Sequence, residues 1–446
     1  MRKSMDNFTR KKSRSTHLHQ INLSLFLPTL ILLFLLQNPT LVSSRNYTNF
    51  RPVSSLRLRR IQNHLNKINK PPVMTIESPD GDIIDCVHKR KQPALDHPLL
   101  KNHKIQRVGP EMPKALKVRK ERSEKRSNEG LKGAWQMWHR NGTRCPKGTV
   151  PIRRTTLEDV LRSKSLFDFG KKQRKTPNDL TARRTDAPDV VSGNGHEHAI
   201  AYTGTSQEVY GAKATINVWD PSIQVVNEFS LSQIWILSGS FDGSDLNSIE
   251  AGWQVSPELY GDSRPRLFTY WTSDSYQATG CYNLLCSGFV QTNGKIAIGA
   301  AISPVSTYKG SQFDITILIW KDPKLGNWWM GFGGNTLVGY WPAELFTHLA
   351  DHATMVEWGG EVVNSRANGE HTSTQMGSGH FAEDGFGKAS YFRNLEIVDS
   401  DNSLSSVSEV STLAENTNCY NIQSAYNNEW GTYFYYGGPG NNPRCS

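Results

Sequence analysis

Two short stretches in the C-terminal half of the chain place glutamates among glycine and tryptophan in a strand-like pattern. Residues 249–255 contain Glu250, and residues 356–362 contain Glu357 and Glu361. Because alternate residues of a strand share a face, each glutamate is expected to share its face with a glycine, which leaves space for a ligand. Two carboxylates that face one groove can act as the acid and the base that hydrolyse a peptide or glycosidic bond. The pattern therefore predicts a two-carboxylate hydrolase.

Other hydrolytic mechanisms find less support in the sequence. The chain has no Gly-x-Ser-x-Gly sequence, the usual turn around a nucleophilic serine. His348 lies in a predicted helix over residues 341–349 and His352 follows four residues later, the spacing of two ligands in some zinc sites, but the residues between them lack the glutamate that would activate water. His196 and His198 border a predicted linker, where we expect them to be solvated. We therefore predict neither a metal nor another cofactor.

The first residues have the composition of a secretory signal. A basic lead is followed by an apolar run over residues 21–36 and by small residues that end at Ser44. An uncleaved signal anchor is the alternative. No later segment approaches membrane-spanning length, so we expect no stable membrane association after cleavage. Acceptor sequences for N-glycosylation at Asn46 and Asn141 agree with export. We expect a secreted protein of the extracellular space or cell wall, with the vacuole as a second destination.

The cysteine count also suits an exported protein. An even number of six cysteines suggests three disulfides, which could pair in about fifteen ways. Their positions favour pairing between neighbours in the sequence. A zinc site is the alternative, but the spacings fit none of the usual ligand pairs. The expected pairs are Cys86 with Cys145, Cys281 with Cys286, and Cys419 with Cys445.

The net charge of +10 hides two halves of opposite sign. From residue 191 onward the chain has 11 Lys and Arg against 25 Asp and Glu, and before it 40 against 16. A basic segment often binds nucleic acid or anionic lipid. In an exported chain with an acidic second half, we expect instead that the basic segment binds that half, more weakly at low pH, and that nucleic acid is not a partner. The alternative is that each half is solvated by its own counterions.

Turn and strand signals divide the chain after the signal region into a small unit and a larger one. In residues 71–165 we expect a turn over 78–81, short strands over 82–87 and 145–154, and a helix that begins at Thr155 or Thr156. Residues 171–194 are rich in Lys, Arg, Thr, Asp, Pro and Gly, which indicates a linker accessible to proteases.

From about residue 198, short apolar or alternating runs follow one another with turn residues between them. Many short strands at this spacing predict an all-β protein, an antiparallel β-sandwich of two sheets or a jelly roll, preceded by a small mixed pro-domain. The predicted strands cover residues 212–219, 231–237, 249–255, 267–272, 296–302, 313–320, 328–332 and 355–363.

Longer motifs resemble the neprosin family of plant secreted proteins. In the C-terminal half they are residues 249–253, 260–262, 267–272, 279–286, 327–329, 339–342, 357–362 and 375–379. Upstream, residues 84–86 and 148–154 resemble the activation peptide of that family. The resemblance covers nearly everything after the signal region. It implies a signal peptide over residues 1–44, a basic activation peptide with its linker over 45–190, and a peptidase domain over 191–446.

The resemblance also implies an activity. It indicates a glutamic endopeptidase, made as a zymogen, that cleaves proline-containing proteins or peptides after proline at acid pH and has its own pro-segment as an intramolecular inhibitor. By motif the catalytic glutamates are Glu250 and Glu357, with Glu361 as the rival for the second position. One glutamate would take a proton from water while its partner protonates the leaving nitrogen. Which glutamate does which stays open.

Further roles follow as expectations. Gln254 is expected to orient a carboxylate or to help stabilise the oxyanion. Trp253, Tyr270 and Trp358 are expected to form an aromatic wall against a proline ring. Removal of the pro-segment is expected within residues 184–197, after Pro188 by the enzyme itself or at Arg183-Arg184 by another protease. The alternatives to a peptidase are a two-carboxylate glycosidase and a non-catalytic module that binds carbohydrate or cell wall.

Overall fold

The structure is a computed structural model. It describes residues 54–114, 136–139, 142–172, 195–204, 207–240, 245–333, 336–366 and 369–446. The expected signal peptide, the glycosylation sites at Asn46 and Asn141, and the processing sites at Arg183-Arg184 and Pro188 lie outside the described residues. Within the described residues, no helix is long and apolar enough to cross a membrane.

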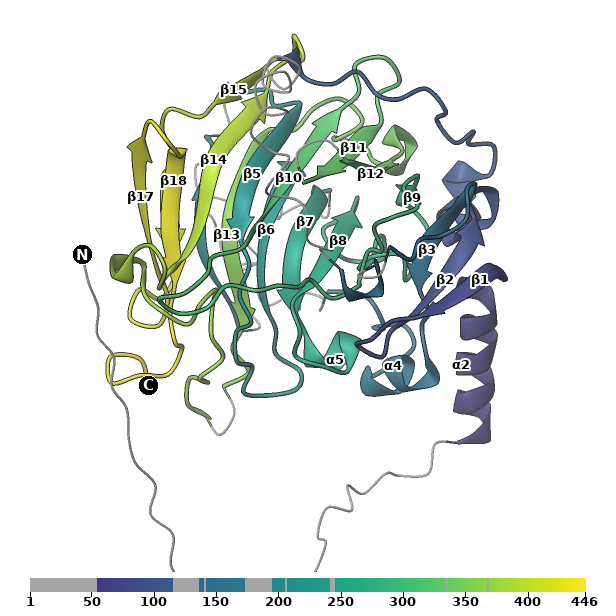
Figure 1. The fold of residues 1–446 in the computed structure, drawn as a ribbon, viewed down its shortest axis with the longest axis horizontal. Helices are drawn as coiled ribbons and strands as arrows, with labels where there is room; N and C mark the ends of the chain where they lie inside the picture. The colour runs from purple at the N-terminus through teal and green to yellow at the C-terminus, as the bar shows by residue number, and fades with distance from the viewer. Residues whose placement is uncertain are drawn as a thin grey trace, which may run out of the picture. The chain divides into compact units, whose positions relative to one another are not determined.

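The described strands of the C-terminal part form two antiparallel sheets, seen one behind the other in Figure 1. The sheet of six strands has the order β16-β4-β13-β6-β7-β8. Its strands are β4 (His196–Tyr202), β6 (Ser230–Ser238), β7 (Asn247–Val255), β8 (Arg266–Thr272), β13 (Met355–Val363) and β16 (Ser411–Ala414).

The second sheet has nine strands among the described residues, in the order β17-β18-β14-β5-β10-β11-β12-β9, with β15 paired to β14. Its strands are β5 (Gly211–Asn217), β9 (Val290–Gln291), β10 (Asp314–Lys321), β11 (Trp328–Phe332), β12 (Thr336–Trp341), β14 (Ser390–Val398), β15 (Leu404–Ser406), β17 (Asn421–Asn427) and β18 (Gly431–Gly437).

The alternation of side chains explains why the two sheets pack face to face. On β7, Ile249, Ala251 and Trp253 point into the main apolar core, where they meet Trp358 of β13 and Ile317 of β10. This packing confirms the predicted all-β sandwich. It also corrects one expectation, because Trp253 and Trp358 lie in the core and therefore on the opposite face from the glutamates of their strands.

The described residues before 173, called the activation segment here after the resemblance found in the sequence, contain helices and strands of their own. A three-stranded sheet joins β1 (Pro72–Glu77), β2 (Ile83–His88) and β3 (Thr149–Arg153), flanked by α2 (Ser55–Ile68) and α4 (Leu157–Arg162). Gly81 has φ of 93°, as the predicted turn over 78–81 requires. Thr156, one of the two residues expected to begin the helix, is the N-cap of α4, and it forms a capping box with Asp159.

Short helical turns complete the structure. The described chain contains α5 (Pro257–Tyr260) and 3-10 turns at Lys89–Lys91, Pro93–Asp96, Pro98–Leu100, Met137–His139, Ala343–Leu345 and Ala382–Asp384. The predicted helix over 341–349 is therefore wrong. β12 continues to Trp341, and the Oδ1 atom of Asn247 accepts hydrogen bonds from the backbone N–H groups of Thr347, His348 and Leu349, which replaces helical bonding at this point.

The structure contains disulfides between Cys86 and Cys145, Cys281 and Cys286, and Cys419 and Cys445. These are the neighbour pairs that the positions in the sequence favour. The first joins two parts of the activation segment on either side of residues that the structure does not describe, and the last ties the C-terminal residues to the sandwich.

Several contacts between the activation segment and the nine-stranded sheet are hydrogen bonds and apolar packing rather than ion pairs. Gln106 donates from Nε2 to Asp322 at 2.8 Å and accepts from Asn327 at 2.9 Å. Its backbone N–H donates to the hydroxyl of Tyr340 at 2.9 Å. Nearby, Ala94 packs in one apolar cluster with tryptophans of β10 and β11. Apart from Asp322, these contacts carry no charge, so acid should leave most of them intact.

A buried ion network joins the activation segment to β8. Arg266 of β8 is 2.6 Å from Asp82 of the activation segment and 2.6 Å from Asp262, and Asp82 also lies 2.8 Å from Arg153. Here the activation segment supplies the acid and the sandwich supplies the base. The attraction expected from the two oppositely charged halves is therefore only part of the contact, since ion pairs of both polarities hold the segment.

The core position of Trp358 predicts a structural role for this side chain. Trp358→Ala should lower the free energy of unfolding by about 3–5 kcal/mol, because it leaves a large cavity between the sheets. Chemical denaturation measures this loss. Tyr426→Ala is the control, because Tyr426 is 63% exposed, and it should change stability by less than about 0.5 kcal/mol. Equal effects of the two substitutions would contradict the assignment of Trp358 to the core.

Candidate active site

Glu250 lies on the face of β7 that points away from the sandwich core, and its side chain is buried. Three uncharged groups donate hydrogen bonds to its carboxylate. The hydroxyls of Ser248 and Tyr276 reach Oε1 at 2.8 and 2.7 Å, and Nε2 of Gln233 reaches Oε2 at 3.1 Å. These bonds hold the carboxylate in one orientation on the face of the six-stranded sheet.

Glu361 lies on β13 and is also buried. Its Oε1 is 2.6 Å from Nδ1 of His196 and 3.9 Å from Nε2 of His198. Burial raises the pKa of Glu361, but the charge of Lys172, the hydrogen bond from His196 and the charge of His198 outweigh burial and hold this pKa well below its ordinary value. Glu361 is therefore a carboxylate in this structure.

Lys172 of the activation segment links the two glutamates. Its Nζ is 2.7 Å from Oε2 of Glu250 and 3.5 Å from Oε2 of Glu361, and its side chain is only 4% exposed. Burial lowers the pKa of Lys172, but the charges of Glu250 and Glu361 raise it further, so the net shift is upward. The ammonium also lies 5.6 and 5.3 Å from the ring centres of Tyr270 and Tyr276. The described site thus holds a charged lysine between two carboxyl groups.

The backbone of the activation segment is bonded into this position. Gly170 has φ of 71°, and its carbonyl accepts a hydrogen bond from the N–H of Tyr282 at 2.8 Å. The N–H of Lys172 donates to the hydroxyl of Tyr270 at 3.2 Å. A side chain at residue 170 would meet Leu285 at 3.0 Å. Glycine therefore allows the turn that carries Lys172 over the sheet.

Strand register explains how two glutamates on separate strands reach one ammonium. In the row of residues between them, Gln233 of β6 pairs with Gly252 of β7 and with Gly359 of β13. A Cβ atom at Gly252 would lie 1.9 Å from the carbonyl oxygen of Ser232, and at Gly359 2.3 Å from that of Ala199. Neither position can carry a side chain, so the two glutamates can extend diagonally toward one another.

The same register separates Glu357 from Lys172. Trp235 of β6 pairs with Glu250 on one side and with Glu357 on the other, so all three side chains share a face and Trp235 stands between the glutamates. Glu361 is four residues further along β13. Lys172 contacts Glu361 and Glu250, and the geometry therefore favours the rival Glu361 over Glu357 as the partner of Glu250.

The expected substrate-binding residues are divided by the fold. Tyr270 lies at the site through its bond to Lys172, while Gln254 shares the outer face of β7 with Glu250, and its Oε1 accepts no hydrogen bond among the described residues. Trp253 and Trp358 lie in the core, as noted above. The expected aromatic wall is instead formed by tyrosines. Tyr270 packs against Tyr276 and Tyr282 at ring-centre distances of 5.7 and 4.7 Å.

A cavity of about 270 Å³ adjoins Lys172. The activation segment lines one side of it with Phe169 and Lys172, and the other side is lined by Gln254 of β7, by Phe229 just before β6 and by Tyr282 after β8. An extended chain could therefore continue across the sheet from the two glutamates. Of the groups around this site, the sequence did not single out Lys172, Tyr276 or Tyr282, and His196 and His198 were expected in solvent although both are buried.

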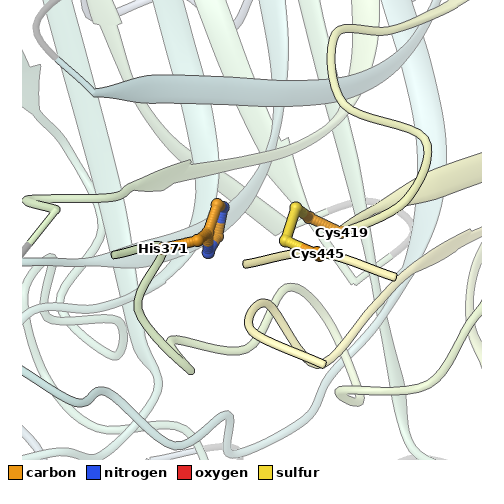
Figure 2. A group of neighbouring side chains, drawn as sticks. All are labelled: His371, Cys419 and Cys445. Atoms are coloured by element: carbon orange, nitrogen blue, oxygen red, sulfur yellow. A yellow bond between two sulfur atoms is a disulfide. The ribbon is translucent and has the colours of Figure 1, made fainter. Parts of the chain in front are cut away.

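The histidines considered for a metal lie elsewhere. His348 is 3.1 Å from Asp245, and His352 is 3.1 Å from Asp351. Neither histidine lies in a helix. A second cluster joins His371 to Cys419 and Cys445 (Figure 2), but these cysteines form a disulfide and so offer no thiolate.

Both ring nitrogens of His371 have partners in the protein. Nδ1 is 2.7 Å from the carbonyl oxygen of Thr372, and Nε2 is 3.1 Å from Oε1 of Glu197. Burial lowers the pKa of His371, but the hydrogen bond to Glu197 raises it overall. We therefore interpret this cluster as a structural ion pair between His371 and Glu197 that lies beside a disulfide.

The fold and the site define a β-sandwich protein whose N-terminal segment covers a pair of buried glutamates. Comparison with known families agrees with this description. Residues 226–439 match the family model described as Neprosin, and residues 75–202 match the one described as Neprosin activation peptide. The chain belongs to the neprosin family, a family of peptidases made with an activation peptide, which confirms the resemblance found in the sequence. The second match extends through β4 of the six-stranded sheet.

Solved structures show a more distant likeness. A scytalido-glutamic peptidase with a peptide-based transition-state analogue is 10% identical over 55% of this chain and 98% of its own, with a TM-score of 0.29. A second structure of a scytalido-glutamic peptidase, with a transition-state analogue inhibitor, is 11% identical over 55% and 97%, with a TM-score of 0.27. SCP-B, a member of the eqolisin family of peptidases in complex with the tripeptide Ala-Ile-His, is 9% identical over 55% and 97%, with a TM-score of 0.27. The fold of this chain rests on its own strand topology.

The buried lysine predicts a dependence of stability on pH. Lys172→Met should destabilise the precursor at neutral pH by about 3–5 kcal/mol, because two buried carboxyl groups lose their cation. The depressed pKa of Glu361 adds stability above the ordinary value of 4.5, and this contribution is lost as the pH falls toward the lower pKa of the folded state. The difference between wild type and variant should therefore shrink below about pH 4.5.

Chemical denaturation across this range measures both effects. Lys324→Met is the matched control, because Lys324 is an exposed lysine paired with Glu111, and it should change stability by less than about 1 kcal/mol at any pH. A Lys172→Met precursor as stable as wild type at neutral pH would contradict the role of this ion pair.

Proposed function

We propose that this protein is the zymogen of a secreted endopeptidase that acts at acid pH, cleaves after proline and uses Glu250 and Glu361 as its catalytic pair. The observation that carries the proposal is the position of Lys172, whose Nζ contacts both carboxylates in a buried site. A cation held between two carboxyl groups marks the place where a water molecule and a peptide carbonyl could later lie. The family match supports a peptidase with an activation peptide.

The proposed reaction needs only the two glutamates and water. When Lys172 has left, two neighbouring carboxyl groups resist double ionisation and share one proton. The ionised glutamate takes a proton from water as the water oxygen bonds to the carbonyl carbon. The protonated glutamate polarises the carbonyl oxygen and then gives its proton to the nitrogen as the C–N bond breaks. Activity falls when the pH rises far enough to remove the shared proton, which places the activity at acid pH.

The activation segment would block this reaction in two ways. Lys172 occupies the space between Glu250 and Glu361, and despite burial its charge holds the pKa of Glu361 low, so that Glu361 stays ionised and cannot donate a proton. Protonation of the carboxyl groups at low pH removes the partners of Lys172. Acid would therefore favour both the release of the segment and the active form of the pair.

The tyrosines of the site support the proposed preference for proline. Tyr270 and Tyr282 border the site and meet edge to face, with ring centres 4.7 Å apart. Aromatic faces and edges offer apolar surface that suits the ring of a prolyl residue. Gln254 shares this face, and we expect it to orient a carboxyl group or to donate to an oxyanion. A glycosidase also uses two carboxyl groups, but the match to an activation peptide favours the peptidase.

Amide substitutions test the catalytic pair. Glu250→Gln and Glu361→Gln should each reduce peptidase activity by about a thousandfold or more, because glutamine keeps the size of the side chain but cannot exchange a proton. Glu357→Gln should retain activity within about tenfold, because Trp235 separates Glu357 from Glu250. The assay follows cleavage of a protein substrate and of a polysaccharide by the processed enzyme at about pH 3 and pH 7, with cleavage sites read by mass spectrometry.

The outcomes distinguish the two candidate pairs. An inactive Glu357→Gln beside an active Glu361→Gln would return the assignment to the pair that the sequence motif suggested. Hydrolysis of the polysaccharide alone would replace the peptidase by a glycosidase. Cleavage without preference for proline would leave the catalytic pair in place and overturn the specificity.

Processing of the zymogen is the second test. We expect acidified wild-type zymogen to be cut after Pro188, because a proline-directed enzyme can cleave its own linker, and to yield a chain that begins at Asp189. The Glu250→Gln zymogen, treated in the same way, should remain uncut. N-terminal sequencing of both proteins measures this. Self-cleavage would be contradicted if the purified Glu250→Gln zymogen matured as fast as wild type. It would also be contradicted if both proteins had a new N-terminus directly after Arg184, since a separate protease would then process the chain.

A further inference from the structure

Two histidines of β4 approach Glu361 from the same side. Residue Glu361 of β13 pairs in register with His198, and Val363 pairs with His196, so the side chains of His196, His198 and Glu361 share one face of the sheet. Nδ1 of His196 is 2.6 Å from Oε1 of Glu361, and Nε2 of His198 is 3.9 Å from the same atom. All three side chains are buried. The His-x-His sequence therefore forms the wall of the site behind one glutamate.

A further carboxylate fixes the second histidine. Glu415 accepts a hydrogen bond from the backbone N–H of His198 at 2.8 Å, and its Oε2 is 3.0 Å from Nδ1 of the same residue. Burial lowers the pKa of His198, but the charge and hydrogen bond of Glu415 and the charges of Glu361 and Glu357 outweigh burial and raise it. Glu415 and Glu361 thus favour the charged form of His198, whose Nε2 faces Glu361 while Nδ1 is bonded to Glu415.

The surroundings of Glu250 are different in kind. Its hydrogen-bond donors are the uncharged groups of Ser248, Tyr276 and Gln233. In the precursor Lys172 is a cation common to both glutamates, and it leaves with the activation segment. Tyr276 and Tyr282 also face the pair, and burial raises the pKa of both well above 10, so they stay uncharged at acid pH. In the processed enzyme the nearby positive charges described in the structure then lie beside Glu361 alone.

We propose that His196 and His198 are positioning residues that keep Glu361 ionised, so that Glu361 is the base that activates water and Glu250 is the acid that protonates the leaving nitrogen. The inference rests on the proposed function, because it assigns the two roles within the same pair. Two carboxyl groups share one proton, and cations beside one of them drive that proton to the other. The proton taken from water goes to Glu361, the proton of Glu250 goes to the amine product, and the two glutamates exchange protons with solvent before the next turnover.

The test is the pH dependence of the processed enzyme with both histidines replaced. His196→Asn keeps a donor at the place of Nδ1, and His198→Gln keeps one at the place of Nε2, but neither side chain carries a charge. In the double variant the acid limb of the kcat profile should move to higher pH by about one unit or more, because the pKa of Glu361 rises when the cations are lost. KM should change little. His348→Asn is the control, since His348 pairs with Asp245 at a partly exposed position, and its profile should match wild type.

A second measurement does not depend on activity or on the folding of the double variant. Histidine NMR titrations of the wild-type protein and of Glu361→Gln should show that the pKa of at least one imidazole falls by about one unit when the glutamate loses its charge. If the wild-type enzyme is active and the double variant has the same pH profile of kcat, the inference is overturned and the proposed function stands. Identical histidine titrations in the wild-type protein and in Glu361→Gln would have the same consequence. A wild-type enzyme without peptidase activity at any pH would overturn the proposed function first.

Discussion

The contact of one lysine with two carboxylates in a dry site is the interaction on which the rest of the structure depends. Lys172 is 4% exposed and Glu250 is fully buried, so neither charge is stabilised by water. Two buried carboxylates without a cation would be costly, and a buried ammonium without carboxylates equally so. Each part of the molecule is therefore stable in this arrangement only while the other is present. The precursor should therefore be stable at neutral pH and lose stability in acid, where protonation of the carboxyl groups removes the partners of Lys172.

The six-stranded sheet can hold such a site because one of its faces packs against the second sheet and the other carries the glutamates. Ile249, Ala251 and Trp253 on one face of β7 bind the second sheet, so the strand is anchored and cannot slip by one residue without burying Glu250 in the core. The other face is then free to carry polar groups at fixed positions. Gly252 and Gly359 keep the space between the glutamates empty of side chains. Rigidity on one face thus provides the positional precision that the other face needs.

Much of this could be predicted from local patterns in the sequence. The predicted strands over 328–332 and 355–363 coincide with β11 and β13, and the capped helix start at Thr156 is present. The predicted strand over 296–302 is not, since only Ala301 and Ile302 make isolated bridges. Ala297 and Ala300 are buried against the activation segment, in a cluster with Ile84 and Cys86, whereas Ile298 and Ile302 belong to the main apolar core. A hydrophobic pattern indicates burial, but it does not say by what.

The site shows the same limit. Glu250 could be identified because its glycine and tryptophan neighbours are adjacent in the sequence, but Glu357 and Glu361 share both motif and face, and only the register with β6 separates them. Trp253 and Trp358 are close to the glutamates in the sequence but point into the core, because residues an odd number of positions apart in a strand face opposite sides. Lys172 carries no local signal at all, because its role comes from contacts with strands that follow it by about eighty residues or more in the chain.

The most direct test of this account is inhibition of the processed enzyme by its own released activation peptide at acid pH. We predict that the wild-type peptide inhibits and that the same peptide with Lys172→Met has an inhibition constant higher by roughly tenfold or more, since it lacks the charged contact with Glu250 and Glu361. Lys324 is not part of this peptide, so Lys101→Met, at an exposed position of the activation segment, is the control and should inhibit like wild type. Equal inhibition by the wild-type and Lys172→Met peptides would contradict the claim that this lysine holds the two glutamates.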